Sequence, residues 1–152
     1  MTAPADILIG LDIGGTSLKA VRMRPDGTEP ETITVPAGGS FERDVLLDRL
    51  SREVQRLARG DVVRRIGCAV GGLVTPDGTM PADATNLPSL AGVPLAPLFR
   101  GALGAPCHVL NDARAALHGE AWLGAAGGRS DVLLVTLGTG IGAGLMLGGR
   151  IR

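Results

Sequence analysis

The chain has 152 residues, a formal net charge of +0 and 45% hydrophobic residues. This length fits one domain, or a small domain with part of another, and the apolar content excludes wholesale disorder. Aromatic residues make up only 2% of the chain, which together with the balanced charge argues against nucleic-acid and membrane-surface partners. The two cysteines, Cys68 and Cys107, are too few for a disulfide framework or a zinc site. Each lies in an apolar run, so we expect buried thiols.

The chain does not open with a charged segment followed by an apolar one, so we predict a cytoplasmic protein without a signal peptide. The uncharged residues 132–149 just reach the length of a transmembrane helix. Their many glycines favour turns and close backbone approach, so we predict that this segment does not span a membrane.

The first forty residues are predicted to form a meander of three strands, at residues 6–13, 17–24 and 31–35. Turn signals separate them at Gly14-Gly15-Thr16 and Pro25-Asp26-Gly27. A helix is predicted next, with Ser40 as its N-cap and Gly60 at its end. The apolar residues at helical spacing are Leu47, Leu50, Val54 and Leu57.

The rest of the chain alternates strands and helices. We predict a strand at 62–70, a loop at 71–93, a helix at 95–103, a strand at 106–110, a helix at 111–123, and strands at 131–137 and 143–151. Three meandering strands followed by helix–strand units indicate one mixed sheet covered by helices. The closing hairpin begins a second unit.

The first polar cluster is residues 11–19, LDIGGTSLK. Gly14 and Gly15 let backbone N–H groups approach a phosphate because no Cβ intervenes, and the Thr16 hydroxyl adds a donor. Asp12 ends an apolar strand, where it could hold Mg²⁺ or orient its waters. Lys19 shares a strand face with apolar neighbours, where a charged side chain is expected to need a partner of opposite charge. The alternative is a plain hairpin turn with a capping aspartate.

The second cluster is residues 136–144, TLGTGIGAG. Its G-x-G-x-x-A pattern matches a dinucleotide-binding fingerprint, but no amphipathic helix follows and no acidic residue remains for a ribose hydroxyl. We therefore interpret the cluster as a second turn that a phosphate can approach. It is built from Thr136, Gly138, Thr139, Gly140 and Gly142. Two such turns indicate a polyphosphate held between two hairpins.

The third cluster lies where a strand runs into a helix, at Asn111-Asp112. Both residue types favour the N-cap position. Alternatively, Asp112 orients a hydroxyl, or acts as its general base, beside a transferable phosphoryl group. In the loop that begins with Gly71-Gly72, Asn86 could bind a sugar hydroxyl or could simply occupy a turn before proline.

Other polar residues give weaker signals. His108 and His118 have no evident partner in the sequence and are interpreted as structural. Glu120 is interpreted either as a residue of a helix face or as a brace for the site.

At these motifs the chain resembles the ROK-family sugar kinases, whose best-known members are bacterial glucokinases. LDIGGTSLKA, the loop with Asn86-Leu87-Pro88, NDARAALHGE and VTLGTGIGAGLMLGGRI occur in the order and spacing of that family. The resemblance covers essentially the whole chain. It implies an α/β protein of the actin-like ATPase, ribonuclease-H-like fold, with a mixed sheet and flanking helices. Residues 1–111 would form the N-terminal domain, and residues 112–152 the connecting helix and first hairpin of an incomplete second domain.

The resemblance also implies roles for individual residues. Asp112 resembles the catalytic base, and sugar contacts would come from Gly71, Gly72, Asn86, Asn111 and Asp112. The residues that resemble the two ATP-phosphate motifs are Asp12, Gly14, Gly15, Thr16 and Lys19 in the first, and Thr136, Gly138, Thr139, Gly140 and Gly142 in the second. The implied cofactors are ATP and Mg²⁺, with Asp12 at the metal. The implied substrate is a hexose, and the full-length form would be a homodimer.

The departures from the family also bear on function. Members are considerably longer, and their Glu-x-Gly-His motif and zinc-binding cysteine cluster do not occur in these residues, so we expect no zinc site in this chain. Because only five residues precede Asp6, we expect a kinase rather than one of the family's helix-turn-helix repressors.

We therefore expect glucokinase-like, ATP-dependent phosphorylation of a hexose, with the isolated chain inactive. A non-catalytic sugar-responsive regulator or a truncated kinase remnant is the alternative. Which hexose is used stays open, as does the choice between ATP and polyphosphate as donor.

Overall fold

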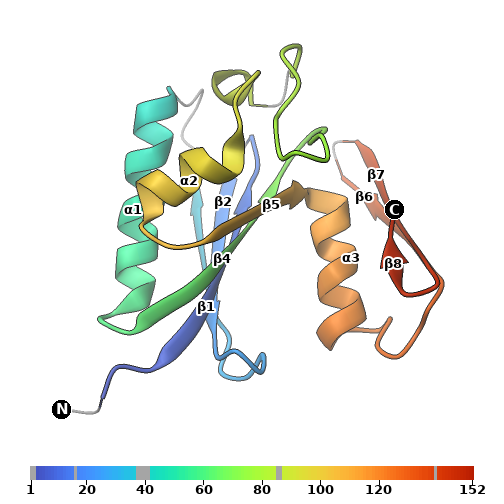
Figure 1. The fold of residues 1–152 in the computed structure, drawn as a ribbon, viewed down its shortest axis with the longest axis horizontal. Coiled ribbons are helices and arrows are strands. Elements are labelled where there is room, and N and C mark those ends of the chain that lie inside the picture. The colour runs from blue at the N-terminus through green and yellow to red at the C-terminus, as the bar shows by residue number, and fades with distance from the viewer. Residues whose placement is uncertain (1–2, 16, 37–41, 85–86, 139) are drawn as a thin grey trace.

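The computed structural model describes residues 3–15, 17–36, 42–84, 87–138 and 140–152. The order of strands and helices is the predicted one except in two places: a short 3-10 helix, η1, is added in the long loop, and the last predicted strand is divided into β7 and β8 (Figure 1). The elements are β1 (Asp6–Ile13), β2 (Ser17–Met23), β3 (Glu31–Pro36), α1 (Arg43–Ala58), β4 (Val62–Val70), η1 (Pro88–Leu90), α2 (Leu95–Leu103), β5 (Cys107–Asn111), α3 (Asp112–Leu123), β6 (Val132–Leu137), β7 (Ile141–Leu147) and β8 (Arg150–Ile151).

The first sheet has five strands in the order β3-β2-β1-β4-β5. β1 pairs antiparallel with β2 and parallel with β4, and β4 pairs parallel with β5. The predicted mixed sheet is therefore confirmed. Because β1, β4 and β5 run in the same direction, their carboxyl ends meet at one edge of the sheet, where α/β sheets place ligands.

Alternation along β1 decides which face of this sheet is the core. Ile7, Ile9, Leu11 and Ile13 are buried on the face covered by α1 and α2 (Figure 1). Leu8, Gly10 and Asp12 belong to the opposite face, because successive strand residues point to opposite sides. Asp12 is therefore held on the face away from the core.

The buried stripe of α1 starts one residue earlier than predicted. Its fully buried residues are Leu46, Leu50, Val54 and Leu57, whereas Leu47 is only half-buried. The spacing rule allows either Leu46 or Leu47 before Leu50, and contact with the sheet selects Leu46. The N-cap of α1 is Glu42, so the predicted N-cap, Ser40, was wrong; Ser40 itself lies outside the described residues.

The second sheet is an antiparallel meander in the order β6-β7-β8. We predicted one strand over residues 143–151, and this was wrong. Gly148 and Gly149 adopt φ values of 56° and 73° and turn the chain between β7 and β8. This is the left-handed backbone region that glycine enters at little cost, so the two adjacent glycines make a tight turn.

One face of the second sheet packs against α3 and the other is bare. The exposed apolar face consists of Leu133, Val135, Leu137, Ile141, Leu145 and Leu147, all at alternate strand positions. Val132–Leu137 and Ile141–Leu147 thus form strands rather than part of a helix. Among the described residues, no helix is long and apolar enough to cross a membrane.

Asp61 ties the amino-terminal segment to the first sheet and to α1. Its carboxylate accepts hydrogen bonds from the Ala5 backbone N–H at 2.9 Å and from Arg22 Nη2 at 2.6 Å. The same guanidinium donates to the Leu57 carbonyl at the end of α1. The Ala5 hydrogen bond, followed by that from Arg22, lowers the pKa of Asp61 below its ordinary value.

We expect Asp61→Asn to lower the free energy of unfolding at neutral pH and to flatten its dependence on pH under acid conditions. A carboxyl group whose pKa is lowered by folding adds stability above its unfolded pKa of about 3.9, and that stability is lost as pH falls through the lower folded value. Urea unfolding at pH 7 and at pH 3 measures the effect. Asp48→Asn, which removes an exposed ion pair with Arg52, is the control and should change little at either pH.

Candidate active site

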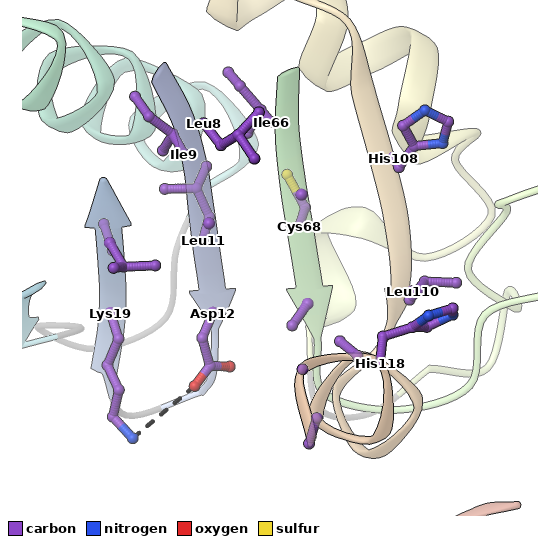
Figure 2. Close-up of a pocket in the computed structure, with 18 of the residues that line it drawn as sticks. Leu8, Ile9, Leu11, Asp12, Lys19, Ile66, Cys68, His108, Leu110 and His118 are labelled. Atoms are coloured by element: carbon purple, nitrogen blue, oxygen red, sulfur yellow. Dashed lines mark ion pairs between the residues drawn. The ribbon is translucent and has the colours of Figure 1, made fainter. Parts of the chain in front are cut away.

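Asp12 and Lys19 face each other at the edge where β1 turns into β2. They are register partners, and Lys19 Nζ lies 3.9 Å from Asp12 Oδ2 (Figure 2). Both side chains remain about half exposed, at 57% for Lys19 and 50% for Asp12. The Lys19 ammonium group, which the sequence analysis expected to need a partner, is therefore paired with Asp12. Both groups remain accessible to solvent.

The first glycine turn is tight. Gly14 N–H donates to the Ser17 carbonyl at 3.0 Å, and a Cβ on Gly14 would lie only 3.2 Å from that oxygen. Gly15 is exposed at the tip of the same turn, and Thr16 lies outside the described residues. The glycines thus bring backbone close beside Asp12, as a phosphate-binding turn requires.

Asp112 is the first residue of α3, and the helix is capped by the residue before it. The Arg114 backbone N–H donates to Asn111 Oδ1 at 3.2 Å, which makes Asn111 the N-cap. Asp112 Oδ1 accepts from the Ala113 N–H at 2.8 Å. The N-cap alternative therefore applies to Asn111, and Asp112 is left with a second carboxylate oxygen for other contacts.

The two carboxylates influence each other electrostatically. Burial raises the pKa of Asp12, Lys19 lowers it, and the negative charge of Asp112 raises it again, so that it ends above its ordinary value. Asp12, Lys19, Asp112 and Thr136 also line one cavity of about 960 Å³. Four different elements thus bring their polar side chains to one space.

These carboxylates suit a divalent cation. An aspartate with a raised pKa beside a second carboxylate gains from a positive charge, and Mg²⁺ is commonly held by one or two carboxylates together with phosphate oxygens. Among the described residues, no three His, Cys, Asp or Glu side chains gather around one point. Asp12 could therefore supply one ligand to a Mg²⁺ ion, and the described residues would leave the other positions to ligands from outside the protein.

The rest of the cavity is largely apolar. It extends over the sheet face that α1 and α2 leave uncovered, along Leu8, Val21 and Leu110, with Trp122 of α3 on its wall. His108 and His118 also line it (Figure 2). The polar group at the strand ends therefore forms one end of a longer groove.

The two histidines are less isolated than the sequence indicated. His108 Nε2 lies 3.3 Å from Arg65 Nη1 on the neighbouring strand. Burial, and secondarily the charge of Arg114, lower the pKa of His118. Both contacts are compatible with the predicted structural role.

The second glycine turn joins β6 and β7. Gly138 N–H donates to the Gly140 carbonyl at 2.9 Å, and a Cβ on either residue would meet open space. Thr139 lies outside the described residues. Because the fold itself would tolerate a side chain at Gly138 and Gly140, the space above them is available to a ligand.

Gly142 and Gly144 have a packing role that the sequence reasoning missed. A Cβ on Gly142 would lie 2.5 Å from Thr136 Oγ1 and 3.2 Å from Ala113 Cβ. A Cβ on Gly144 would lie 3.0 Å from both the Ala113 carbonyl oxygen and Leu117 Cβ. Their spacing of two along a strand was the available signal, because alternate residues share a face. These glycines let α3 lie directly on β7.

We expect Gly144→Ala to destabilise the protein by about 1–3 kcal/mol, the usual range for overpacking a tight contact. Gly140→Ala is the matched control in the same hairpin and should be neutral or slightly stabilising, because its Cβ meets open space. Urea unfolding of both variants measures the difference. Equal stabilities would contradict the close packing of α3 on β7.

The loop after β4 lies beside Asp112. A Cβ on Gly71 would be 3.9 Å from Asp112 Oδ2. Gly72 has a φ of 104°, and its carbonyl accepts a hydrogen bond from Asn111 Nδ2 at 2.9 Å. Asn86, predicted further along this loop, lies outside the described residues. The structure thus brings Gly71, Gly72, Asn111 and Asp112 together.

Glu120 lies outside this group. Its Oε2 accepts from the Ala125 N–H at 2.8 Å, so the side chain braces the loop after α3. Glu120 does not line the cavity that contains Asp12 and Asp112. The two thiols, Cys68 and Cys107, are buried and free, as expected.

The model of the ROK family matches residues 8–152. The chain belongs to the ROK family. This ROK chain is 31% identical over 146 residues to a glucokinase of Streptomyces coelicolor, covering 96% of itself and 45% of that protein. It is 38% identical over 153 residues to the bifunctional enzyme NanE/NanK of Brucella melitensis, covering 97% of itself and 28% of that protein.

Among solved structures, the ROK chain is similar to a ROK family glucokinase from Streptomyces griseus in complex with glucose and AMPPNP. The TM-score is 0.83 at 31% identity, over 96% of this chain and 46% of that one. The predicted actin-like ATPase fold is confirmed for the part that the chain spans. The chain spans about half the length of the glucokinases that it matches.

Proposed function

We propose that this ROK chain is the part of a kinase that binds the sugar and carries the catalytic base. The kinase transfers the terminal phosphoryl group of ATP to a hexose hydroxyl. The supporting observation is the convergence of Asp12, Lys19, Asp112 and Thr136 on one cavity. A base-like carboxylate, a cation and two glycine turns are the parts that phosphoryl transfer to an alcohol needs. The glucokinase relatives support the choice of a hexose.

In this proposal the sugar lies on the open side of Asp112 and the Gly71-Gly72 backbone, which are close neighbours, and Asn86 would also contact it. Asp112 accepts a hydrogen bond from the reacting hydroxyl and takes its proton late, because the transition state of phosphoryl transfer is loose. The carboxylate therefore acts mainly by orienting the hydroxyl towards the phosphorus.

The ATP phosphates lie between the two glycine turns. The Gly14 and Gly138 N–H groups donate within the protein, so other backbone N–H groups of the two turns would donate to phosphate oxygens. The hydroxyls of Thr16, Thr136 and Thr139 would donate as well. Lys19 supplies positive charge from β2. Mg²⁺ at Asp12 would neutralise charge on the transferred phosphate.

The two sheets support a division of the chain at Asn111. Residues 1–111 would be one domain, and residues 112–152 the linking helix and first hairpin of the next. The first phosphate turn belongs to one side of this boundary and the second turn to the other. A kinase cleft between two domains would then close on ATP from both sides.

The test is a coupled assay for ADP release by a family-length protein that carries this chain. Glucose, mannose, N-acetylmannosamine, N-acetylglucosamine and fructose are the acceptors, and ATP is compared with inorganic polyphosphate as donor. Saturable turnover with one sugar is the expected result. Sugar binding by calorimetry without turnover on any of them would indicate a sugar-responsive regulator instead.

A further inference from the structure

Lys19 balances the charge of the carboxylate that could hold Mg²⁺. It is the only lysine in the sequence, and it lies directly opposite Asp12 in the first sheet. Among the described residues, Asp12 makes one ion pair, in which the Lys19 ammonium nitrogen is 3.9 Å from Oδ2 (Figure 2). Asp112, which lines the same cavity, adds negative charge rather than balancing it. The positive partner of Asp12 is therefore Lys19.

This ion pair is easily released. At 3.9 Å the two groups attract each other by charge, but they are too far apart for a hydrogen bond. Both side chains are about half exposed, and exposed pairs contribute little to stability. The charge of a lysine is also carried on a flexible stem of four carbons. Lys19 can therefore exchange Asp12 for another anion without disturbing the fold.

The Lys19 ammonium and a metal ion compete for the same carboxylate. A divalent and a univalent cation that share one carboxylate are about 5 Å apart, and their repulsion in water lowers the affinity roughly tenfold. Among the described residues, no cluster of three His, Cys, Asp or Glu side chains is available to offset this loss. The charge of Lys19 therefore disfavours the binding of a bare cation at Asp12.

Phosphate oxygens would reverse this competition. Lys19 lines the same cavity as Asp12, near the first glycine turn, where the proposed function places the phosphates of ATP. An ammonium group that moves to a phosphate oxygen leaves the Asp12 carboxylate free. The phosphates also bring the additional oxygen ligands that Mg²⁺ prefers.

We infer that Lys19 controls when Asp12 can take up a metal ion. Lys19 occupies the Asp12 carboxylate in the empty site and moves to the phosphates when the nucleotide binds. Asp12 therefore takes up Mg²⁺ together with the phosphates rather than before them. This inference rests on the proposed function in one respect, namely that Asp12 is the residue that meets the metal.

The test measures binding of Mn²⁺ alone to the 152-residue chain, by electron paramagnetic resonance of the free ion at about 0.01 M ionic strength, where screening is weak. Mn²⁺ prefers the same oxygen ligands as Mg²⁺. Lys19→Met removes the charge and should bind Mn²⁺ roughly tenfold more tightly than the wild type. Lys19→Arg keeps the charge and should bind no more tightly. Adding Asp12→Asn to Lys19→Met should abolish the gain.

Arg65→Met is the matched control, because it removes one positive charge from the same cavity. Arg65 is the register partner of Leu8, four strand positions from Asp12, which corresponds to about 13 Å along the sheet. At that distance the loss of a positive charge should change the Mn²⁺ affinity by no more than about twofold.

Chemical modification tests the same charge without a mutation. Because Lys19 is the only lysine, acetylation removes its charge and reductive methylation keeps it. Both reagents also modify the terminal amine, so the difference between the two products reports on Lys19. The acetylated chain should bind Mn²⁺ more tightly than the methylated one.

Equal Mn²⁺ affinities of the wild type and Lys19→Met would overturn the inference, as would the absence of bound Mn²⁺ in both. An equal gain in Arg65→Met, or a gain that survives Asp12→Asn, would also overturn it, because the effect would then not act through Asp12. These measurements use neither sugar nor ATP. A family-length enzyme that phosphorylates no sugar would therefore refute the proposed function separately, without changing the metal-binding result.

Discussion

Asp112→Asn should lower kcat by about 10²–10⁴ in a family-length kinase while leaving sugar affinity nearly unchanged, because a positioned base acts mainly in the transition state. The substitution preserves size, and the asparagine oxygen can still accept from the Ala113 N–H as Oδ1 does now. The fold around α3 should therefore survive. What is lost is the carboxylate oxygen beside Gly71.

Steady-state kinetics paired with sugar-binding calorimetry measure this effect. Asp44→Asn is the control, because Asp44 is an exposed carboxylate on α1, across the sheet from the cavity. Near wild-type kcat in Asp112→Asn would remove Asp112 from the mechanism. A loss confined to sugar affinity would assign it to binding alone.

The 152-residue chain on its own should show no hexokinase activity above background. The first phosphate turn belongs to the five-stranded sheet, whereas the second belongs to a three-stranded sheet with one bare apolar face. Leu137 and Ile141, which flank the second turn, are 80% and 82% exposed. An apolar sheet face that is left exposed favours self-association, so the second turn would not be held in the position that ATP needs.

Orientation of bound groups is worth up to about 7–11 kcal/mol in well-positioned systems, and most of it would be missing here. A coupled ADP assay with the same panel of sugars measures the activity, and light scattering after size exclusion measures self-association through the bare face. The positive control is the same chain continued by the second half of a glucokinase relative. Robust turnover by the monomeric chain would mean that these residues hold ATP without help.

Sequence patterns predicted the order of elements and the mixed sheet because those features are local. Turn residues at Pro25-Asp26-Gly27, alternation along residues 6–13 and helical spacing after residue 43 each depend on neighbours in the chain. Asp12 and Asp112 come together because β1, β4 and β5 are parallel and share an edge, which the structure shows. For these features the local sequence patterns and the strand topology lead to the same arrangement.

The features that were missed depend on contacts distant in sequence. The residues near Leu46 do not indicate whether Leu46 or Leu47 packs against the sheet. The residues near His108 do not predict its contact with Arg65, which lies 43 positions earlier. Gly142 and Gly144 looked like part of a phosphate turn because their partner, α3, lies one element away. The three protein partners of Asn111 became visible only in the folded chain.

The direct passage from β5 into α3 has a mechanical consequence. β5 ends at Asn111 and α3 begins at Asp112, with no residue between them, while α3 lies on the second sheet through Gly142 and Gly144. This junction is the covalent connection between the two sheets, so a rotation of one sheet against the other would pivot near the Asn111–Asp112 peptide bond. Atoms near the pivot move least, so Asp112 would keep its position while one sheet rotates against the other. The two glycine turns lie farther from this junction, so the same rotation would displace them the most.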